Sequence, residues 1–368
     1  MRITHVAIQD FRNFELVRIG VPEQRHFLLG ENAQGKSNFL EALGFLSAMR
    51  SFRVSEIPPL IRAGQSIARI IFKIDHEEAG EQEIEMEVRR GKKRVLINGD
   101  RISKLSSIIG RYPVVTLSSE DMEFLRGNPA TRRRFLDLVL STLYPEYLEQ
   151  LKRYTQSLRE RNQLLKAAGG NADQCDAFER QMAPAAFQLV EMRRRFFQDF
   201  RKDLEVIYNR ISTRDEMPEL VYKLSSDFKS EVDFRDLLQR ERERDRLLGN
   251  TRVGPHRDDF LIQLQGRKAS AFASEGQKRG LVVALRLAEC EAILRVLGVR
   301  PVLIADDVVG ELDAERRNQF WNCLDDGMQV FASGTLLPDA RFSSWNILEV
   351  NRGSLQRSRM QQPPNSDD

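Results

Sequence analysis

The chain has 368 residues, of which 41% are hydrophobic and 30% charged, and 57 Lys+Arg against 54 Asp+Glu give a formal net charge of +3. This composition excludes a disordered chain, a collagen-like fibre and a disulfide-stapled miniprotein, and the length suggests about two domains. Three scattered cysteines and four scattered histidines predict neither a zinc site nor a disulfide framework, and they favour a cytoplasmic protein. No apolar run is long enough to span a membrane, so we expect no membrane association.

The first hundred residues are expected to form strands around a single helix. Alternating or short apolar runs predict strands at residues 3–8, 26–29, 68–74, 84–88 and 94–97. The expected helix runs from Ser37 to about Met49, and turns at Arg90-Gly91-Lys92 and Asn98-Gly99 make this part rich in hairpins.

From about residue 120 the hydrophobic period becomes that of a helix. Apolar residues at steps of three or four predict one long helix from Phe178 to Ile207 and a shorter one from Tyr144 to Leu165. With Gly169-Gly170-Asn171 as a turn, the two are expected to pack antiparallel as a hairpin arm. The alternating charges of residues 240–246 predict an ion-paired helix.

Strand and helix signals alternate again towards the C-terminus. Strands are predicted at 260–264, 302–305, 329–331 and 347–350, with helices from Ser274 to about Leu297 and from near Ala314. The polar tail from Gly353 to Asp368 is expected to be disordered. The sequence therefore predicts an α/β domain made of residues 1–118 and 251–352, a mainly helical lobe inserted at 119–250, and a tail at 353–368.

A phosphate-binding loop follows the strand at 26–29. Its sequence matches G-x-x-x-x-G-K-[ST], and it stands between an apolar strand and a helix, which argues against a chance glycine turn. Lys36 can bridge the β- and γ-phosphates, and the Ser37 hydroxyl is a Mg²⁺ ligand. The motif predicts ATP or GTP binding by Gly30, Glu31, Asn32, Ala33, Gln34, Gly35, Lys36 and Ser37.

Two acidic residues, Asp306 and Asp307, end the apolar strand at 302–305. A carboxylate at the carboxyl end of a strand in a nucleotide-binding sheet faces the Mg²⁺, so Asp306 is the expected metal ligand. Asp307 could orient or deprotonate the attacking water. The alternative is a solvated turn or helix cap, where Asp pairs are common.

A second glycine motif, Ser274-Glu-Gly-Gln277, opens the helix that follows it. Ser274 can cap this helix. The same Ser, Gly and helix N-terminus can also form a second anion site, which one subunit would offer to the nucleotide of another in a head-to-tail dimer.

Together with Glu311-Leu312-Asp313, these motifs resemble the ABC-type ATPase heads of transporter subunits and SMC proteins. Three further segments narrow the resemblance to the RecF family: Phe11-Arg-Asn-Phe14, Gly127-Asn-Pro129 with the following Arg132–Asp137, and Thr251–Asp259. The resemblance covers the chain except its tail. It implies an ABC-type P-loop ATPase head with an antiparallel β subdomain in the N-terminal part, the inserted helical lobe, and the signature and Walker B motifs in the C-terminal part.

The resemblance implies an ATP-dependent DNA-binding protein of replication-gap and recombinational repair and the SOS response. Such proteins form homodimers on ATP that clamp single-stranded DNA and gap junctions, use slow, DNA-stimulated hydrolysis as a switch, and help RecA to load together with RecO and RecR. Carried over, Lys36 and Asp307 are catalytic, and Arg12 and Asn13 lie beside the nucleotide. The residues expected to act across the dimer are Ser274, Gly276 and Gln277, at the partner's γ-phosphate, and Asp313, at the seam.

Some positions depart from the wider ABC pattern. Asp307 stands where many heads have Glu, which leaves its role as base open, and no clear glutamine follows Val114-Val115. We assign no catalytic role to Glu120 or Asp121.

Basic triplets are the expected DNA contacts, because non-specific binding needs cations that neutralise phosphates. The triplets are Lys92, Lys93, Arg94; Arg132, Arg133, Arg134; and Arg193, Arg194, Arg195. The alternative for each is a solvated, ion-paired helix or strand face.

Three other functions fit the sequence less well. The 237 residues between Ser37 and Ser274 (274 − 37), filled by a helical arm, argue against a transporter subunit. The arm is too short for a long-armed SMC protein. Lys36, Ser37 and Asp306 argue against a scaffold with a vestigial nucleotide site.

Overall fold

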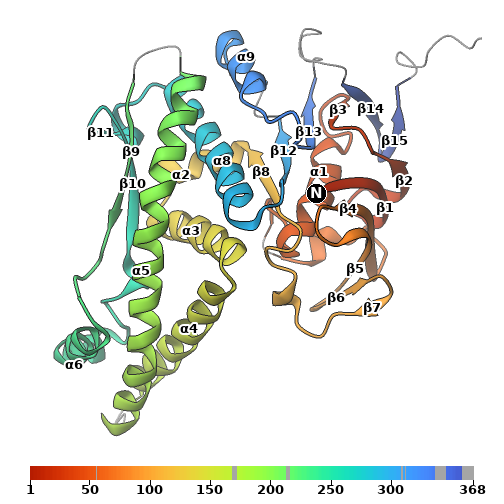
Figure 1. The fold of residues 1–368 in the computed structure, drawn as a ribbon. Coiled ribbons are helices and arrows are strands. Elements are labelled where there is room, and N and C mark those ends of the chain that lie inside the picture. The colour runs from red at the N-terminus through yellow and green to blue at the C-terminus, as the bar shows by residue number, and fades with distance from the viewer. Residues whose placement is uncertain are drawn as a thin grey trace, which may run out of the picture. The chain divides into compact units, whose positions relative to one another are not determined.

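The structure, a computed structural model, describes residues 1–54, 56–167, 172–212, 216–307, 310, 312–335 and 345–358 (Figure 1). It divides into two compact units. The first contains Met1–Asp121, Arg210–Arg214 and Arg279–Asp368, and the second contains Met122–Asn209 and Asp215–Lys278. The second unit thus extends to Lys278 instead of the expected residue 250.

A six-stranded sheet forms the centre of the first unit, in the order β15-β14-β3-β13-β12-β8. Its strands are β3 (Arg25–Leu29), β8 (Val114–Ser118), β12 (Val302–Asp306), β13 (Val330–Gly334), β14 (Asn346–Asn351) and β15 (Ser354–Arg357). All neighbours pair in parallel except β15, which returns antiparallel to β14. Every residue of β12 is buried, as expected for a parallel strand covered on both faces. Helix α1 (Lys36–Ala48) packs on β8, β12 and β13.

An antiparallel sheet makes up the rest of the first unit's N-terminal part. Its strands, in spatial order, are β2 (Phe14–Gly20), β1 (Arg2–Phe11), β4 (Ile67–His76), β5 (Gly80–Arg89), β6 (Lys92–Ile97) and β7 (Asp100–Arg101). Alternation buries one face of β4: Ile70 and Phe72 are fully buried and join a core that includes Phe39 and Leu43 of α1. Helices α8 (Glu275–Leu297) and α9 (Ala314–Asn322) complete the main elements, and α8 begins in the second unit.

The second unit combines helices with a small sheet. The helices are α2 (Glu123–Arg126), α3 (Pro129–Leu143), α4 (Pro145–Lys166), α5 (Ala172–Ile211), α6 (Glu231–Leu248) and α7 (Ala269–Phe272), and the sheet has the order β11 (Arg267–Lys268), β10 (Asp259–Leu264), β9 (Pro218–Lys223). Across the two units, short 3₁₀ turns lie at Pro58–Leu60, Leu105–Ser107, Ser119–Met122 and Pro255–Arg257.

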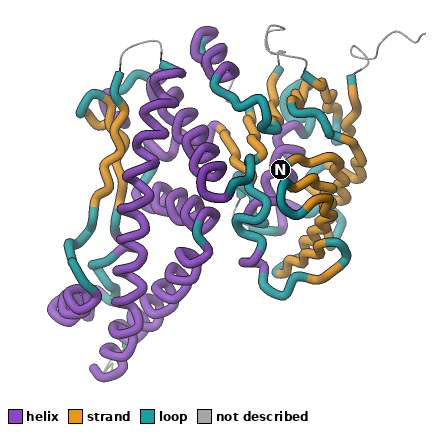
Figure 2. The backbone as a smooth tube through the Cα atoms, in the orientation of Figure 1, coloured by secondary structure: helices purple, strands orange, loops and turns teal. Residues whose placement is uncertain are grey.

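The predicted helical hairpin arm is confirmed as α4 and α5, two long helices of the same unit (Figure 2). Arg161 near the end of α4 bonds to Glu179 near the start of α5, and Tyr147 near the start of α4 bonds to Arg193 further along α5. This order of contacts makes the helices antiparallel. The expected turn at Gly169–Asn171 lies outside the described residues.

The expectation of a disordered tail from Gly353 is wrong for its first residues. Residues 354–357 form β15, and Leu355 packs against the core of the first unit. Residues 359–368 lie outside the described residues. In the described part of the chain, no helix has both the length and the apolar character needed to cross a membrane.

Candidate nucleotide-binding site

The phosphate-binding loop joins β3 to α1, as its motif predicts. Ala33 and Gly35 have positive φ angles of 63° and 120°. The φ of Gly35 requires glycine, and an added Cβ would lie 2.7 Å from Asn13 Nδ2 and displace that side chain. The backbone of the loop therefore turns sharply before α1 begins at Lys36, as an anion site formed by backbone N–H groups requires.

Lys36 folds back over this loop. Its Nζ donates to the carbonyl oxygens of Gly30 at 2.6 Å and Glu31 at 3.0 Å, and the residue is only 4% exposed. The Lys36 ammonium group thus lies against the loop, in position to contact a phosphate bound there.

Asp306 is the meeting point of two hydroxyl groups. Ser37 Oγ from α1 and Ser333 Oγ from β13 each donate to Asp306 Oδ1 at 2.9 Å. Burial raises the pKa of Asp306, these two hydrogen bonds act to lower it, and the neighbouring charge of Asp307 raises it again. The pairing of parallel strands explains the geometry, since the carboxyl ends of β3, β12 and β13 share one edge of the sheet.

Ser333 is a site residue that the sequence analysis missed. Its available signal was a polar residue near the end of an otherwise apolar central strand, Val330–Gly334, beside the strand that carries Asp306. Ser333 also accepts a hydrogen bond at 3.0 Å from the backbone N–H of Asp307.

The two adjacent aspartates have different environments. Asp307 is exposed and has a left-handed φ of 56°, whereas Asp306 is buried. Ser37 and Asp306 therefore fit a Mg²⁺ site, because Mg²⁺ uses a few hard oxygen ligands and completes its shell with phosphates and water. Asp307 contacts Ser333 through its backbone N–H and is open to solvent.

Asn13 and Arg12, expected beside the nucleotide, differ in their contacts. Asn13 Nδ2 donates to the Gln34 carbonyl of the loop at 3.1 Å. Arg12 instead forms a two-pronged ion pair with the buried Glu41 of α1, with both N···O distances at 2.7 Å. Asn13 thus touches the loop itself, and Arg12 supports the helix behind it.

The Ser274 motif caps α8 in the second unit. The Gln277 backbone N–H donates to Ser274 Oγ at 3.3 Å, and the Ser274 N–H donates to Gln277 Oε1 at 2.6 Å, which is a reciprocal capping box. Gln277 also donates through Nε2 to Glu216 at 2.7 Å. Ser274 is exposed, and Gly276 is half-buried. Asp313 likewise caps α9, accepting from the Arg316 N–H at 2.9 Å.

The basic triplets are not uniformly exposed. In the second unit, Arg132 is 7% exposed and pairs with Asp259 at 2.7 Å, and Arg133 donates to the Asp258 carbonyl at 2.7 Å. Arg193 is 1% exposed and also contacts Asp258. We therefore withdraw Arg132 and Arg193 as DNA contacts, because buried ion pairs hold them inside the unit.

The first triplet lies on β6 of the first unit. Lys93 is half-buried, with Nζ donating to the Met49 carbonyl at 2.5 Å and lying 5.2 Å from the Phe45 ring centre. Lys92 and Arg94 are exposed. Among the residues of the second triplet, Arg134 is exposed.

The segment Thr251–Asp259 has a structural role in the second unit. His256 contacts the Tyr154 hydroxyl at 2.5 Å and the Thr251 carbonyl at 3.0 Å, and burial lowers the pKa of His256 to about 4. Gly254 has a φ of 119°, and a Cβ there would lie 2.6 Å from the Tyr154 hydroxyl. This motif therefore joins the arm to β10.

Asp121 and Glu120 also differ in their surroundings. Asp121 accepts from the Ser118 N–H at 2.9 Å and pairs with Arg286 at 2.7 Å, which fixes the end of β8. Burial raises the pKa of Glu120.

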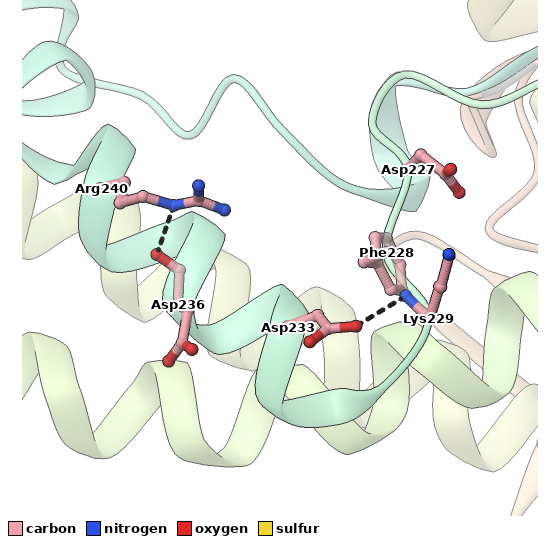
Figure 3. Close-up of a pocket in the computed structure, with 6 residues that line it drawn as sticks. All are labelled: Asp227, Phe228, Lys229, Asp233, Asp236 and Arg240. Atoms are coloured by element: carbon pink, nitrogen blue, oxygen red, sulfur yellow. Dashed lines mark hydrogen bonds between the residues drawn. The ribbon is translucent and has the colours of Figure 1, made fainter.

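A surface pocket lies near the start of α6 in the second unit. It is lined by Asp227, Phe228, Lys229, Asp233, Asp236 and Arg240 (Figure 3). Asp233 accepts from the Lys229 N–H at 3.1 Å, and Arg240 Nε donates to the Asp236 carbonyl at 3.4 Å. These polar groups are engaged in local contacts around the first turns of the helix.

Comparison with known proteins gives consistent similarities. The sequence model of the "RecF/RecN/SMC N terminal domain" family matches residues 2–333. The "DNA replication and repair protein RecF" of Acaryochloris marina is 32% identical, covering 97% of this chain and all of that protein, and the protein of the same name from Agathobacter rectalis is 33% identical, covering 97% and 99%.

Solved structures show the same similarity. A structure described as the recombination mediator protein RecF with ATP in the RecFOR pathway superposes with a TM-score of 0.90, at 27% identity and 97% coverage of both chains. An Smc head bound to the C-winged helix domain of ScpA gives a TM-score of 0.56 at 17% identity, with 97% of both chains covered, which is a likeness of fold alone. The expected ABC-type head with an antiparallel subdomain and an inserted helical lobe is confirmed.

Proposed function

The chain belongs to the RecF family of DNA replication and repair proteins, and from this premise we propose that it is an ATP-dependent DNA-binding protein of replication-gap repair. The observation that carries the proposal is the convergence of Ser37 and Ser333 on Asp306, beside a curled loop that holds Lys36. A turn with a purely structural role does not require a lysine, two serines and a buried aspartate in this arrangement. The solved RecF structure described with ATP supports the choice of ATP over GTP.

In this proposal the loop residues Gly30 to Ser37 bind the phosphates of ATP. Backbone N–H groups and the N-terminus of α1 supply partial positive charge, and Lys36 exchanges its carbonyl partners for phosphate oxygens. Bound Mg²⁺, held by Ser37 and Asp306, would neutralise phosphate charge. Asp307, exposed at the end of β12, orients the attacking water and accepts its proton in a slow hydrolysis that DNA accelerates.

We infer that a second copy of the chain completes the nucleotide-binding site. Ser274 is exposed at the start of α8, where the positive end of the helix dipole favours an anion. Ser274, Gly276 and Gln277 of each copy would meet the γ-phosphate bound to the other, with Asp313 at the seam. ATP would then close a homodimer on DNA, and hydrolysis would open it.

The biological setting follows from the family. We propose that the dimer acts in the cytoplasm on single-stranded DNA and on gapped duplexes, with RecO and RecR as partners and RecA loading and the SOS response downstream. Support comes from the solved RecF structures, which are described as part of the RecFOR pathway.

Light scattering tests the dimer directly. We expect the mass of the full chain to double with ATP, not with ADP or without nucleotide, and gapped DNA to strengthen the doubling. Ser274→Arg should bind ATP but stay monomeric. Ser230→Arg is the matched control, because Ser230 caps α6 of the same unit in the same way, accepting from the Asp233 N–H at 3.1 Å. A normal ATP dimer of Ser274→Arg would disprove the role in trans.

A further inference from the structure

The turn between β14 and β15 is hydrogen-bonded to the phosphate-binding loop. Its central residues, Arg352 and Gly353, have positive φ angles of 47° and 78°. The Gly353 N–H donates to the Gln34 carbonyl at 3.1 Å, and the Arg352 N–H donates to Gln34 Oε1 at 2.8 Å. A segment 318 residues away in the chain thus holds Gln34 through both its backbone and its side chain.

Close backbone approach makes this contact specific. A Cβ on Gly353 would lie 2.5 Å from the Asn13 carbonyl oxygen, and a Cβ on Gly30 would lie 2.5 Å from the Val350 carbonyl oxygen. Glycine is therefore needed both in the turn and at the start of the loop. The hairpin and the loop are fitted to each other at two points.

The Gln34 carbonyl has two donors from outside the loop, the Gly353 N–H and Asn13 Nδ2. In a planar trans peptide the carbonyl and the next N–H point in opposite directions. Hydrogen bonds that fix the direction of the Gln34 carbonyl thus also fix the direction of the Gly35 N–H. Backbone N–H groups of such loops are the ones that cradle phosphates.

We propose that the Arg352–Gly353 turn is a positioning element of the nucleotide site. Together with Asn13, it orients the peptide between Gln34 and Gly35 so that the Gly35 N–H donates to a phosphate. The inference rests on the proposed function, ATP binding at this loop. It extends the site to a C-terminal segment that carries no nucleotide-binding motif.

Two variants and a control test the binding consequence. Gly353→Ala places a Cβ against the Asn13 carbonyl and lifts the turn from the loop, and Asn13→Asp replaces the second donor by an acceptor of the same shape. Gly91→Ala is the matched control: Gly91 has a φ of 76° in the β5–β6 turn, and an added Cβ would meet nothing within 4 Å.

Calorimetric titration of the full chain with ATP and Mg²⁺, without DNA, gives the affinities. We expect about tenfold weaker binding for Gly353→Ala and Asn13→Asp and wild-type binding for Gly91→Ala, a tenfold change being about 1.4 kcal/mol. Melting temperatures without nucleotide record the loss of stability, which should be larger for Gly353→Ala because only there does the added Cβ meet a backbone oxygen. Equal affinity of Gly353→Ala and the wild type would overturn the inference while leaving the proposed function standing. Failure of the wild type to bind ATP would overturn both.

A spectroscopic measurement separates positioning from a general loss of stability. The sequence contains two Gln–Gly pairs, Gln34–Gly35 and Gln265–Gly266, so ¹³C-carbonyl Gln with ¹⁵N Gly labelling selects two amide signals. With saturating ATP, the Gly35 amide proton should move downfield in the wild type and Gly91→Ala but much less in Gly353→Ala. Gly266, in the second unit, serves as the reference. A full Gly35 shift in Gly353→Ala would refute the positioning role.

Discussion

At the residue scale, the chemistry of the site depends on the different burial and hydrogen bonding of two adjacent aspartates. Asp306 is buried and accepts two hydroxyl hydrogen bonds, whereas Asp307 is exposed. Burial raises the pKa of Asp306, and the hydroxyls of Ser333 and Ser37 partly offset this effect. Two serines therefore favour the charged form of Asp306, which a cation needs as ligand, and only Ser37 is itself an expected ligand.

Ser333→Ala should change the pH dependence of Mg²⁺-supported ATP binding. Loss of the Ser333 hydroxyl removes a hydrogen bond that lowers the pKa of Asp306, so this pKa rises further. As pH falls, Asp306 would then be protonated earlier, and the affinity should begin to fall at a higher pH than in the wild type. Titrations with Mg²⁺-ATP across pH measure this.

Asp306→Asn provides the control for that experiment. It removes the titrating carboxyl, so its pH profile reports only the titration of ATP and of the other groups of the protein. If the profiles of Ser333→Ala and the wild type coincide after this correction, Ser333 does not tune Asp306.

At the element scale, most helices and strands were predictable because their signals are local. The apolar stripes of α4 and α5 and the alternation in β1 and β4 are each contained in one segment. The loop residues Lys36 and Ser37 and the strand end at Asp306 were predictable for the same reason.

Features that depend on distant partners were not predictable. Ser333 joins the site only through the pairing of β12 with β13, and the Gly353 turn only through the register of β14 beside β3. The strand β15 was missed because Leu355 is the one apolar residue in it. Arg132 and Arg193 were predicted to be exposed because their ion-pair partners, Asp259 and Asp258, lie far away in the sequence.

The arm contains a second buried charge of this kind, Arg161, which yields a stability prediction. Arg161 is fully buried on α4 and pairs with Glu179 at 3.0 Å and Asp245 at 2.7 Å. In Arg161→Ala, Glu179 would keep its ion pair with Arg242, but the buried Asp245 would be left without its cation, which typically costs about 3–5 kcal/mol. We expect a loss of that order in the free energy of unfolding of the second unit, measured by urea denaturation.

Arg153→Ala is the matched control on the same helix. Arg153 pairs with Glu149 one turn away, and both side chains are mostly exposed. Such pairs contribute little, so the unfolding midpoint should barely change. Equal effects of the two substitutions would mean that the buried network does not stabilise the arm.

At the scale of the whole molecule, a net charge of +3 is too small to draw the chain to DNA by itself. DNA affinity must then come from a local surface. With Arg132 and Arg193 buried in ion pairs, the exposed pair Lys92 and Arg94 on β6 becomes the main proposed contact, and Arg134 in the second unit is a further one. Lys92 and Arg94 alternate with the half-buried Lys93, so they share one face of the strand.

Lys92→Ala with Arg94→Ala should weaken DNA binding and reduce its salt dependence. Each lost phosphate contact lowers the slope of log K against log salt by about 0.9 for duplex DNA and about 0.7 for single strands. Filter binding with ATP at several salt concentrations measures the slope. Arg244→Ala with Arg246→Ala is the control, because it removes equal charge from α6, where both arginines pair with glutamates one turn away. If the control weakens binding as much, affinity follows net charge and β6 is not the DNA surface. If only the β6 variant loses slope, the DNA surface includes the antiparallel sheet of the first unit.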